Sequence, residues 1–390
     1  MKYINLDNVC EFVRNGASIK QDSQCNEGIP ITRIETISND KFNFDRLGYA
    51  NIKDDKYSDY YLKDKDVLLS HINSAKYLGR SVLYRKKDEN PIIHGMNLLC
   101  LRFIKDKYLP DYFVYYSQSN VAKAYIQKHT KLAVNQASIT STAIKDMPIP
   151  MIEMGKQKEI SKSLDKCNEI IHKHKQLLSK YDFLIKSRFI EMFGDNPTKN
   201  EKWKVEKLGN LGLCKNGMNF SYEDNGFEIN CLGVGDFKDN AVITNCEDLP
   251  VISLNEKPSE EYLLQDNDIV FVRSNGNKEL VGRSVLIHPT VLTTFSGFCI
   301  RFRLSTNAIN HLFLLQFLKM PNTRKNMAGR GANIQNLNQQ ILSNLDIPVP
   351  QIELQNDFAA FVQQIDKSKF EIWLYINMCY IIKKRVFTYD

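Results

Sequence analysis

The sequence lacks the features that mark several common classes of protein. No run of apolar residues is long enough to cross a bilayer, and the opening segment, residues 1–7, has an acidic residue and no apolar core of signal-peptide length. No stretch combines low hydrophobicity with a high density of one charge, so long disordered segments are not expected. We therefore expect a folded protein of the cytoplasm.

Cysteine spacing gives no sign of a metal site or a disulfide framework. The nine cysteines are an odd number, and no two of them stand at the close spacing of zinc ligands. This pattern favours reduced, cytosolic thiols, and we expect no metal site.

Motifs of catalysis are also missing. The sequence has no Walker phosphate loop and no His-Glu-x-x-His pair. Adenine methylation needs an Asn/Asp-Pro-Pro-aromatic loop, and the one near match, Asp-Asn-Pro-Thr at 195–198, lacks the second proline and the aromatic residue; we interpret it as a loop that ends a helix. The carboxylate pairs at 54–55 and 260–261 lack the companion lysine of a nuclease site. We expect no catalytic residue and no cofactor in this chain.

What the sequence contains is enough apolar material for two domains. Of its 390 residues 43% are hydrophobic, with 21 Phe and 18 Tyr, and the length exceeds that of a usual single domain. The net charge of +7 suits a polyanionic partner such as nucleic acid, although many ordinary soluble proteins carry a similar excess.

An internal repeat sets the organisation of the chain. Gly-Arg-Ser-Val-Leu at 79–83 recurs letter for letter at 282–286, and Leu-x-Asp-x-Asp at 62–66 recurs at 264–268. Downstream, Asp-Met-Pro-Ile-Pro at 146–150 matches Asp-Ile-Pro-Val-Pro 200 positions later. Three blocks in one order indicate two similar halves.

Each half reads as a mixed α/β globular part followed by a long helix. Runs at 66–69, 81–84, 98–103 and 299–303 are typical of strands. Aromatic and aliphatic residues at helical spacing predict one helix from Pro110 to about His129, and another from about Asn310 to Lys319.

The long helices carry a heptad seam with spacing 4,3,4,3. In the first half it comprises Ile160, Leu164, Cys167, Ile171, His174, Leu178, Tyr181, Ile185, Arg188 and Met192. In the second half it comprises Leu354, Phe358, Phe361, Ile365, Ser368, Ile372, Tyr375, Cys379, Ile382 and Val386. At 1.5 Å per residue each helix would be on the order of 50 Å long, so the simplest partner for each is the other, packed antiparallel. We interpret the polar members His174, Arg188 and Ser368 as register-setting residues.

These features resemble the specificity subunits of type I restriction-modification systems. The resemblance rests on the duplicated Asp-Ile-Pro-type ending before a Glu and a Gln, as at 346–355, and on a long helix that closes in Phe-Ile-Glu-Met-Phe-Gly-Asp at 189–195. Two extra residues separate Glu153 from Gln157, compared with Glu353 and Gln355, which affects where the first helix starts.

The resemblance implies an α/β (α+β) fold with two repeated target-recognition domains joined by two long antiparallel coiled-coil helices. It implies a non-catalytic subunit that reads a bipartite target in double-stranded DNA. Its partners would be two methyltransferase subunits, which would bind S-adenosylmethionine, and possible nuclease or translocase subunits. The expected domains are 1–152 and 196–350 for target recognition, with helical spacers at 153–195 and 351–390.

Polar loops at matching places in the two halves are the candidate DNA contacts, since base reading needs hydrogen-bonding side chains supported by cations. One pair of loops is 71–76 and 273–278, and the other is 129–136 and 329–336. The candidate residues, which include an arginine shared by the exact repeat, are His71, Asn73, Lys76, Arg80, Lys131, Asn135, Gln136, Arg273, Ser274, Asn275, Lys278, Arg283, Arg330, Asn333 and Gln335.

Three alternatives stay open at this point. Each loop could be a solvated polar turn, and the two repeated arginines could form structural salt bridges. The whole chain could be a protein-binding scaffold on a coiled-coil strut, although the polar character of the loops argues against this. It could also serve a related defence system that lacks the nuclease.

Overall fold

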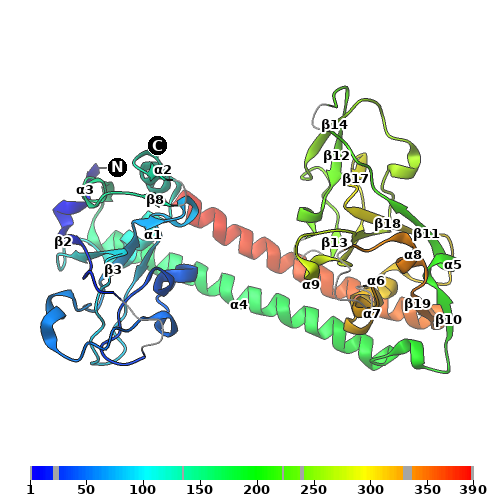
Figure 1. The fold of residues 1–390 in the computed structure, drawn as a ribbon, viewed down its shortest axis with the longest axis horizontal. Helices are drawn as coiled ribbons and strands as arrows, with labels where there is room; N and C mark the ends of the chain where they lie inside the picture. The colour runs from blue at the N-terminus through cyan, green and yellow to red at the C-terminus, as the bar shows by residue number, and fades with distance from the viewer. Residues whose placement is uncertain are drawn as a thin grey trace. The chain divides into compact units, whose positions relative to one another are not determined.

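The computed structural model describes residues 2–20, 26–133, 136–221, 224–237, 241–327 and 336–387. Its contacts divide the chain into two compact units (Figure 1). Unit 1 consists of Met1–Gln176 and Ile372–Asp390, and unit 2 consists of Leu177–Glu371. This division cuts through both long helices, whereas the four segments predicted from the sequence have their limits at the helix ends. Each unit therefore contains one globular part and a portion of each helix.

Unit 1 is built on a four-stranded antiparallel sheet in the order β2-β6-β3-β5. Two small sheets, β1-β9 and β4-β8-β7, complete it. The strands are β1 Lys2–Asn5, β2 Cys10–Asn15, β3 Val67–Ser70, β4 Ile72–Asn73, β5 Ser81–Leu83, β6 Leu98–Phe103, β7 Lys131–Leu132, β8 Ala137–Ser138 and β9 Pro148–Met151. The helices are α1 Pro110–Ser117, α2 Asn120–Lys128, α3 Ser141–Lys145 and the first part of α4, Met154–Phe193.

Unit 2 repeats this order of strands and adds to it. Its sheet β11-β18-β15-β16-β13 contains counterparts of the four strands in the main sheet of unit 1, in the same order. The pair β10-β19 repeats β1-β9, and unit 2 has a further sheet, β14-β12-β17. The strands are β10 Lys204–Lys207, β11 Gly212–Asn216, β12 Phe227–Leu232, β13 Val242–Ile243, β14 Val251–Leu254, β15 Asp268–Val272, β16 Ser284–Ile287, β17 Thr293–Phe295, β18 Cys299–Leu304 and β19 Asp346–Val349. The helices are α5 Leu208–Leu211, α6 His311–Lys319, α7 Pro321–Met327, α8 Gln339–Ser343 and α9 Ile352–Arg385. The predicted duplication of a mixed α/β domain is confirmed.

The backbone conformation explains why both copies of the exact repeat begin with glycine. Gly79 and Gly282 both have φ +77°, a left-handed conformation that glycine adopts without steric cost. The Gly79 N–H donates to the carbonyl of Ser70 at 2.8 Å, and the Gly282 N–H donates to that of Val272 at 2.9 Å. Each glycine therefore returns the chain into the sheet beside the strand it has just left.

A duplicated arginine–aspartate pair fixes the start of the central strand in each sheet. Arg102 Nε and Nη2 donate to the two carboxylate oxygens of Asp66 at 2.8 and 2.7 Å. Arg303 makes the same two bonds to Asp268 at the same distances. Because both aspartates are buried, these bidentate pairs hold β3 against β6 and β15 against β18.

The helix expected from Pro110 to about His129 is two helices. The chain breaks at Ser119, whose hydroxyl accepts a hydrogen bond from the Ala122 N–H at 3.2 Å and caps α2. Serine favours this N-cap position because its side chain satisfies a backbone donor that the helix leaves free. In unit 2, α6 likewise ends at Lys319, and α7 starts at Pro321.

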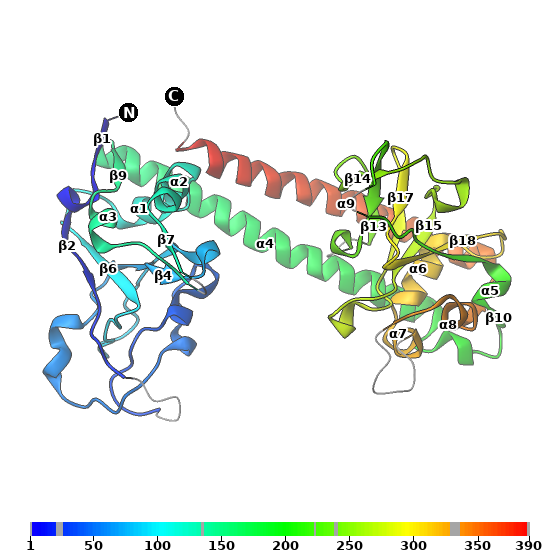
Figure 2. The same cartoon turned by 45° about the horizontal axis from the view of Figure 1, so that its top comes forward.

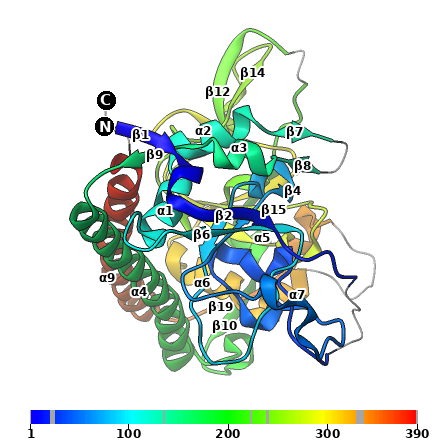
Figure 3. The same cartoon turned by 90° about the vertical axis from the view of Figure 1, so that its left-hand side faces the viewer.

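Within each unit the portions of α4 and α9 run antiparallel. In unit 1, Asn168 of α4 accepts a hydrogen bond from Lys383 of α9 at 2.7 Å, and nearer the middle of both helices the His174 ring lies 5.8 Å from that of Tyr375. Figures 2 and 3 both show these helix portions side by side. Among the described residues, no helix combines the length and hydropathy that a membrane span needs.

The residues of the seam predicted on α4 are all buried or half-buried, as are most of those predicted on α9, but Tyr375 and Ile382 of α9 are wrong. Tyr375 and Ile382 are 54% and 40% exposed, whereas Val362 and Ile376 are each only 7% exposed. Apolar or long side chains stand at both the third and fourth positions after Phe358, Ile372 and Cys379, so spacing alone could not choose between them. Next to the predicted seam residue Ser368, the amine of Lys369 bonds to Asp182 of α4 at 2.5 Å.

Candidate DNA-binding surface

In unit 1 the two predicted loops lie next to each other. Strand β4, in the first loop, pairs with β8 at the end of the second, with Asn73 opposite Ala137. The N–H of Ile139 donates to the carbonyl of His71 at 2.9 Å. β7, which begins the second loop, adds to the same small sheet. Residues separated by about sixty positions in the chain therefore form one polar edge.

Unit 2 joins its loops in the same way. Ser274 forms an antiparallel bridge with Asn336, and the Leu337 N–H donates to the Arg273 carbonyl at 2.8 Å. In both units the second loop leads into a short helix capped by a side chain, Thr140 in one and Asn338 in the other. The paired loops are therefore a duplicated feature of the fold.

Most of the described candidate residues reach the surface. Lys76, Lys131, Gln136 and Lys278 are exposed, and Asn73, Arg80, Arg273, Ser274, Asn275 and Arg283 are half-buried. Local bonds hold some of them: the Asn73 side chain donates to Ser70 Oγ and accepts from the Ser74 N–H, and an Arg273 guanidinium nitrogen donates to the Gly297 carbonyl at 3.2 Å. Asn135, Arg330, Asn333 and Gln335 lie outside the described residues.

His71 departs from the exposed turn that the sequence predicts. It is only 6% exposed, its Nδ1 has no hydrogen-bond partner among the described residues, and burial lowers its pKa. The preceding strand β3 is buried at all four positions, and the chain stays in the interior for one residue more. In this conformation the ring cannot touch a ligand at the surface.

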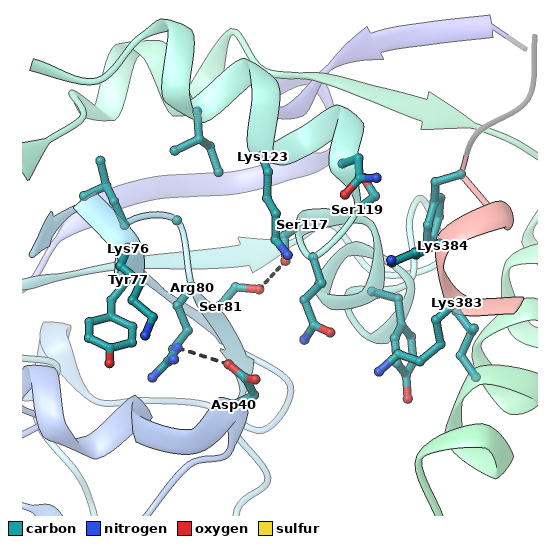
Figure 4. A pocket seen from close by; sticks show the side chains of 18 of the residues that line it. Asp40, Lys76, Tyr77, Arg80, Ser81, Ser117, Ser119, Lys123, Lys383 and Lys384 are labelled. Atoms are coloured by element: carbon teal, nitrogen blue, oxygen red, sulfur yellow. Dashed lines mark hydrogen bonds and ion pairs between the residues drawn. The ribbon is translucent and has the colours of Figure 1, made fainter. Parts of the chain in front are cut away.

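Lys76 and Arg80 line a basic cavity of about 350 Å³ in unit 1 (Figure 4). Lys123 of α2 and Lys383 and Lys384 of α9 also face it. Arg80 Nε forms an ion pair with Asp40 at 3.0 Å, which bears out the salt-bridge alternative for this arginine. Lys123, Lys383 and Lys384 could not be identified from the sequence, because residues that come together from separate segments of the chain leave no local signal.

The helix surface of unit 1 is unusually apolar. Large hydrophobic side chains on the last part of α9 are exposed by 39% or more, namely Trp373, Leu374, Tyr375, Met378, Tyr380, Ile381 and Ile382. Unit 2 exposes Phe183, Leu184 and Phe370 on its helix portions. Contiguous apolar surface of this kind is typical of protein–protein interfaces.

Comparison with known proteins supports one family. The family model described as "Type I restriction modification DNA specificity domain" matches residues 1–180 and 200–373. The chain is 32% identical over 382 residues to the putative type I restriction enzyme MjaX specificity subunit of Methanocaldococcus jannaschii, covering 93% of this chain and 85% of that protein. It is 24% identical over 374 residues to the type I restriction enzyme StySPI specificity subunit of Salmonella potsdam, covering 90% and 79%.

Solved structures share the fold. The type I restriction-modification S subunit from M. genitalium aligns with a TM-score of 0.54 at 13% identity, over 98% of this chain and 93% of that one. A chain from a structural study of the assembly and conformational transition of a type I system aligns with a TM-score of 0.52 at 14% identity, over 98% and 97%. Because the family model covers most of both halves and a relative exceeds 30% identity over nearly the whole chain, this protein belongs to the type I restriction-modification DNA specificity family.

Proposed function

We propose that this chain reads a bipartite sequence in double-stranded DNA, one part with each unit, and directs adenine methylation or cleavage by partner subunits. The observation that carries this proposal is the same connection in both units: β4 in the loop 71–76 pairs with β8, directly after the loop 129–136, and Ser274 in the loop 273–278 forms a bridge with Asn336. Two equivalent edges on two similar units suit two separate half-sites. Membership of the family makes the chain a specificity subunit and disfavours a scaffold without a role on DNA.

The partners follow from the same proposal. Two methyltransferase subunits would dock on the apolar surfaces of the long helices, and S-adenosylmethionine would bind to those subunits. A nuclease or translocase subunit could complete the assembly, and the proposal does not require one. The site of action would be the cytoplasm, where the DNA of a bacterial or archaeal cell is found.

Adenine-methylation mapping tests the proposal. Long-read sequencing of DNA from cells that express the chain with its cognate methyltransferase should reveal a split motif that is absent without the chain. No chain-dependent methylation, with both proteins soluble and associated, would contradict the proposal.

A domain exchange tests the division of labour. Replacing residues 1–150 with the same region of another subunit should change one part of the methylated motif and leave the other intact. The matched exchange of residues 196–350 should change only the second part. A change of both parts by either exchange would contradict modular reading.

A further inference from the structure

Unit 2 has a cavity of about 350 Å³ whose charged lining residues are mostly cations. Arg283 precedes β16, Lys319 ends α6 and Arg324 lies on α7, while Lys186 and Lys369 come from the long helices. Only two carboxylates, those of Asp182 and Asp366, face the same space. The lining therefore has an excess of positive charge.

Both carboxylates are already engaged by one lysine. The Lys369 amine lies 2.5 Å from Asp182 and 3.7 Å from Asp366. Neither Lys319 nor Arg324 has a carboxylate within ion-pair distance among the described residues; the Arg324 guanidinium donates only to the carbonyls of Glu279 and Val281, at 2.8 and 3.0 Å. The charge of these two side chains is not neutralised locally.

The arrangement is unfavourable without an anion. Burial, together with the positive charges of Lys369 and Arg283, lowers the pKa of Lys319 to about 8, although Asp182 and Asp366 act in the opposite direction. Burial and the charge of Arg283 also lower the pKa of Arg324. The hydroxyl of Ser284, which is 1% exposed, lines the cavity and has no hydrogen-bond partner among the described residues. A bound anion would accept a hydrogen bond from the buried Ser284 hydroxyl and would reduce the repulsion between the cations.

The cavity has a counterpart at the same place in unit 1. Arg80 and Ser81 match Arg283 and Ser284 in the exact repeat, and Lys123 matches Arg324 at the offset that relates α2 to α7. In unit 1, however, Arg80 pairs with Asp40, and Ser81 is hydrogen-bonded to Ser117 at 2.6 Å (Figure 4). The Ser81 hydroxyl thus has an internal partner, whereas the Ser284 hydroxyl has none among the described residues, which makes unit 2 the stronger candidate for a ligand.

We infer that the unit 2 cavity binds a phosphate group, held by Arg283, Lys319 and Arg324 with a hydrogen bond from the Ser284 hydroxyl. Guanidinium groups match the oxygen spacing of phosphate, and an ammonium group adds a point charge. The phosphate could be a diester of the DNA backbone or free inorganic phosphate. Arg324 is hydrogen-bonded to the carbonyls of Glu279 and Val281, which follow the loop 273–278 directly, so a phosphate bound to Arg324 would reduce the mobility of that loop. Because the loop is a candidate DNA contact, this connection favours DNA as the source of the phosphate, an argument that rests on the proposed function.

The test uses the full chain in complex with its methyltransferase and compares Lys319→Met and Ser284→Ala with the control Lys325→Met, an exposed lysine of α7 outside this cavity. One arm measures the rise in melting temperature caused by inorganic phosphate over chloride at equal ionic strength. The other measures the affinity for duplex DNA as a function of salt. Lys319→Met should lose the phosphate effect while melting no lower than wild type in chloride, because it removes an unfavourably buried charge.

If DNA supplies the phosphate, Lys319→Met should weaken DNA binding about tenfold for all sequences and reduce the slope of log K against log salt by about 1, with the methylated motif unchanged. Loss of the phosphate effect with normal DNA binding would support the site and assign it to free phosphate. Unchanged behaviour of Lys319→Met and Ser284→Ala in both arms would overturn the inference. Failure of the proposed function would show differently, as wild-type protein without chain-dependent methylation.

Discussion

Gln157 and Gln355 make the same hydrogen bonds from two different helices. Each is the fourth residue of its long helix and fully buried. The Gln157 side-chain oxygen accepts from the Leu109 N–H at 2.9 Å, and that of Gln355 accepts from the Asn310 N–H at 2.9 Å. Residues 154–156, which separate Glu153 from Gln157, are the first three residues of α4, and the contact of Gln157 is the same as that of Gln355. Each glutamine therefore bonds its long helix to the N-cap residue of a helix in its own unit, α1 in unit 1 and α6 in unit 2.

Replacing these glutamines should destabilise the unit that contains them. Gln355→Met would leave unpaired the Asn310 N–H and the carbonyls of Ala308 and Pro350, to which Gln355 donates at 3.0 and 2.8 Å. We expect a loss of about 3 kcal/mol in the free energy of unfolding. Gln157→Met should cost less, because its amide donates only to Ile152.

Urea unfolding followed by hydrogen exchange would locate each loss in its unit. Gln363→Met, at an exposed position of α9, serves as the control and should change little. Equal stability of Gln355→Met and this control would contradict a locking role.

The arginine–aspartate pairs predict unit-specific loss of stability. Asp268→Asn would leave Arg303 without the charge of its partner at a site where Asp268 is fully buried and Arg303 is 27% exposed. We expect a cost of about 3 kcal/mol, because a buried charge loses its compensation. Hydrogen exchange should increase in β15 and β18, and Asp66→Asn should produce the same effect in β3 and β6 instead. An increase in the wrong unit would show that the pairs do not act locally.

Buried His94 should make unit 1 sensitive to acid. Its Nε2 donates to the Leu98 carbonyl at 2.8 Å, and burial, together with the charges of Arg14, His71 and Arg102, lowers its pKa to about 4. Unfolded histidine has a pKa near 6.5, so the unfolded chain binds a proton first as the pH falls. Stability should therefore decrease as the pH falls from about 6.5 toward 4, by about 2 kcal/mol between pH 7 and pH 5.

The check is urea unfolding of wild type and His94→Gln at both pH values. The glutamine amide can still donate to Leu98 but does not titrate, so the variant should show a smaller loss in acid. His129→Gln, at an exposed histidine, is the control. An equal loss in His94→Gln and wild type would assign the acid sensitivity to other groups.

Repeats and periodicity predicted the architecture because they are properties of many residues at once. The two copies of the exact repeat, around Gly79 and Gly282, have the same glycine φ and lie at the same place in the strand order of their sheets. Patterns that depend on single positions were less reliable. Ile376 takes the place expected for Tyr375, since the face that a helix buries is set by its partner as well as by its own spacing.

The candidate surface was predictable as loops but not as side chains. The sequence identified the loop pairs from their matching positions, and the structure adds that β4 and β8 bring the two loops of unit 1 together. The burial of His71 depends on the packing of the preceding strand β3, and the cavity around Lys319 depends on the meeting of four helices, α4, α6, α7 and α9. Such features arise from tertiary packing, which local sequence does not encode.

The antiparallel helix pairing predicts one internal disulfide under oxidation. Cys167 of α4 and Cys379 of α9 are both buried in unit 1, and burial together with the neighbouring Cys167 thiol raises the pKa of Cys379. A thiol oxidant such as diamide would take two electrons from the pair, release two protons and join the sulfurs. Because the thiolate is the reacting form, the rate should increase with pH.

Non-reducing electrophoresis of the oxidised chain should reveal a faster-migrating band, since the bond closes a large loop, and peptide mapping should identify the linked pair. Either Cys167→Ser or Cys379→Ser should abolish the band, whereas Cys299→Ser in unit 2 should retain it. If the two helices packed in a different register, the thiols would be too far apart to form a disulfide. Failure to form this bond even at alkaline pH would therefore contradict the packing of α4 on α9 in unit 1.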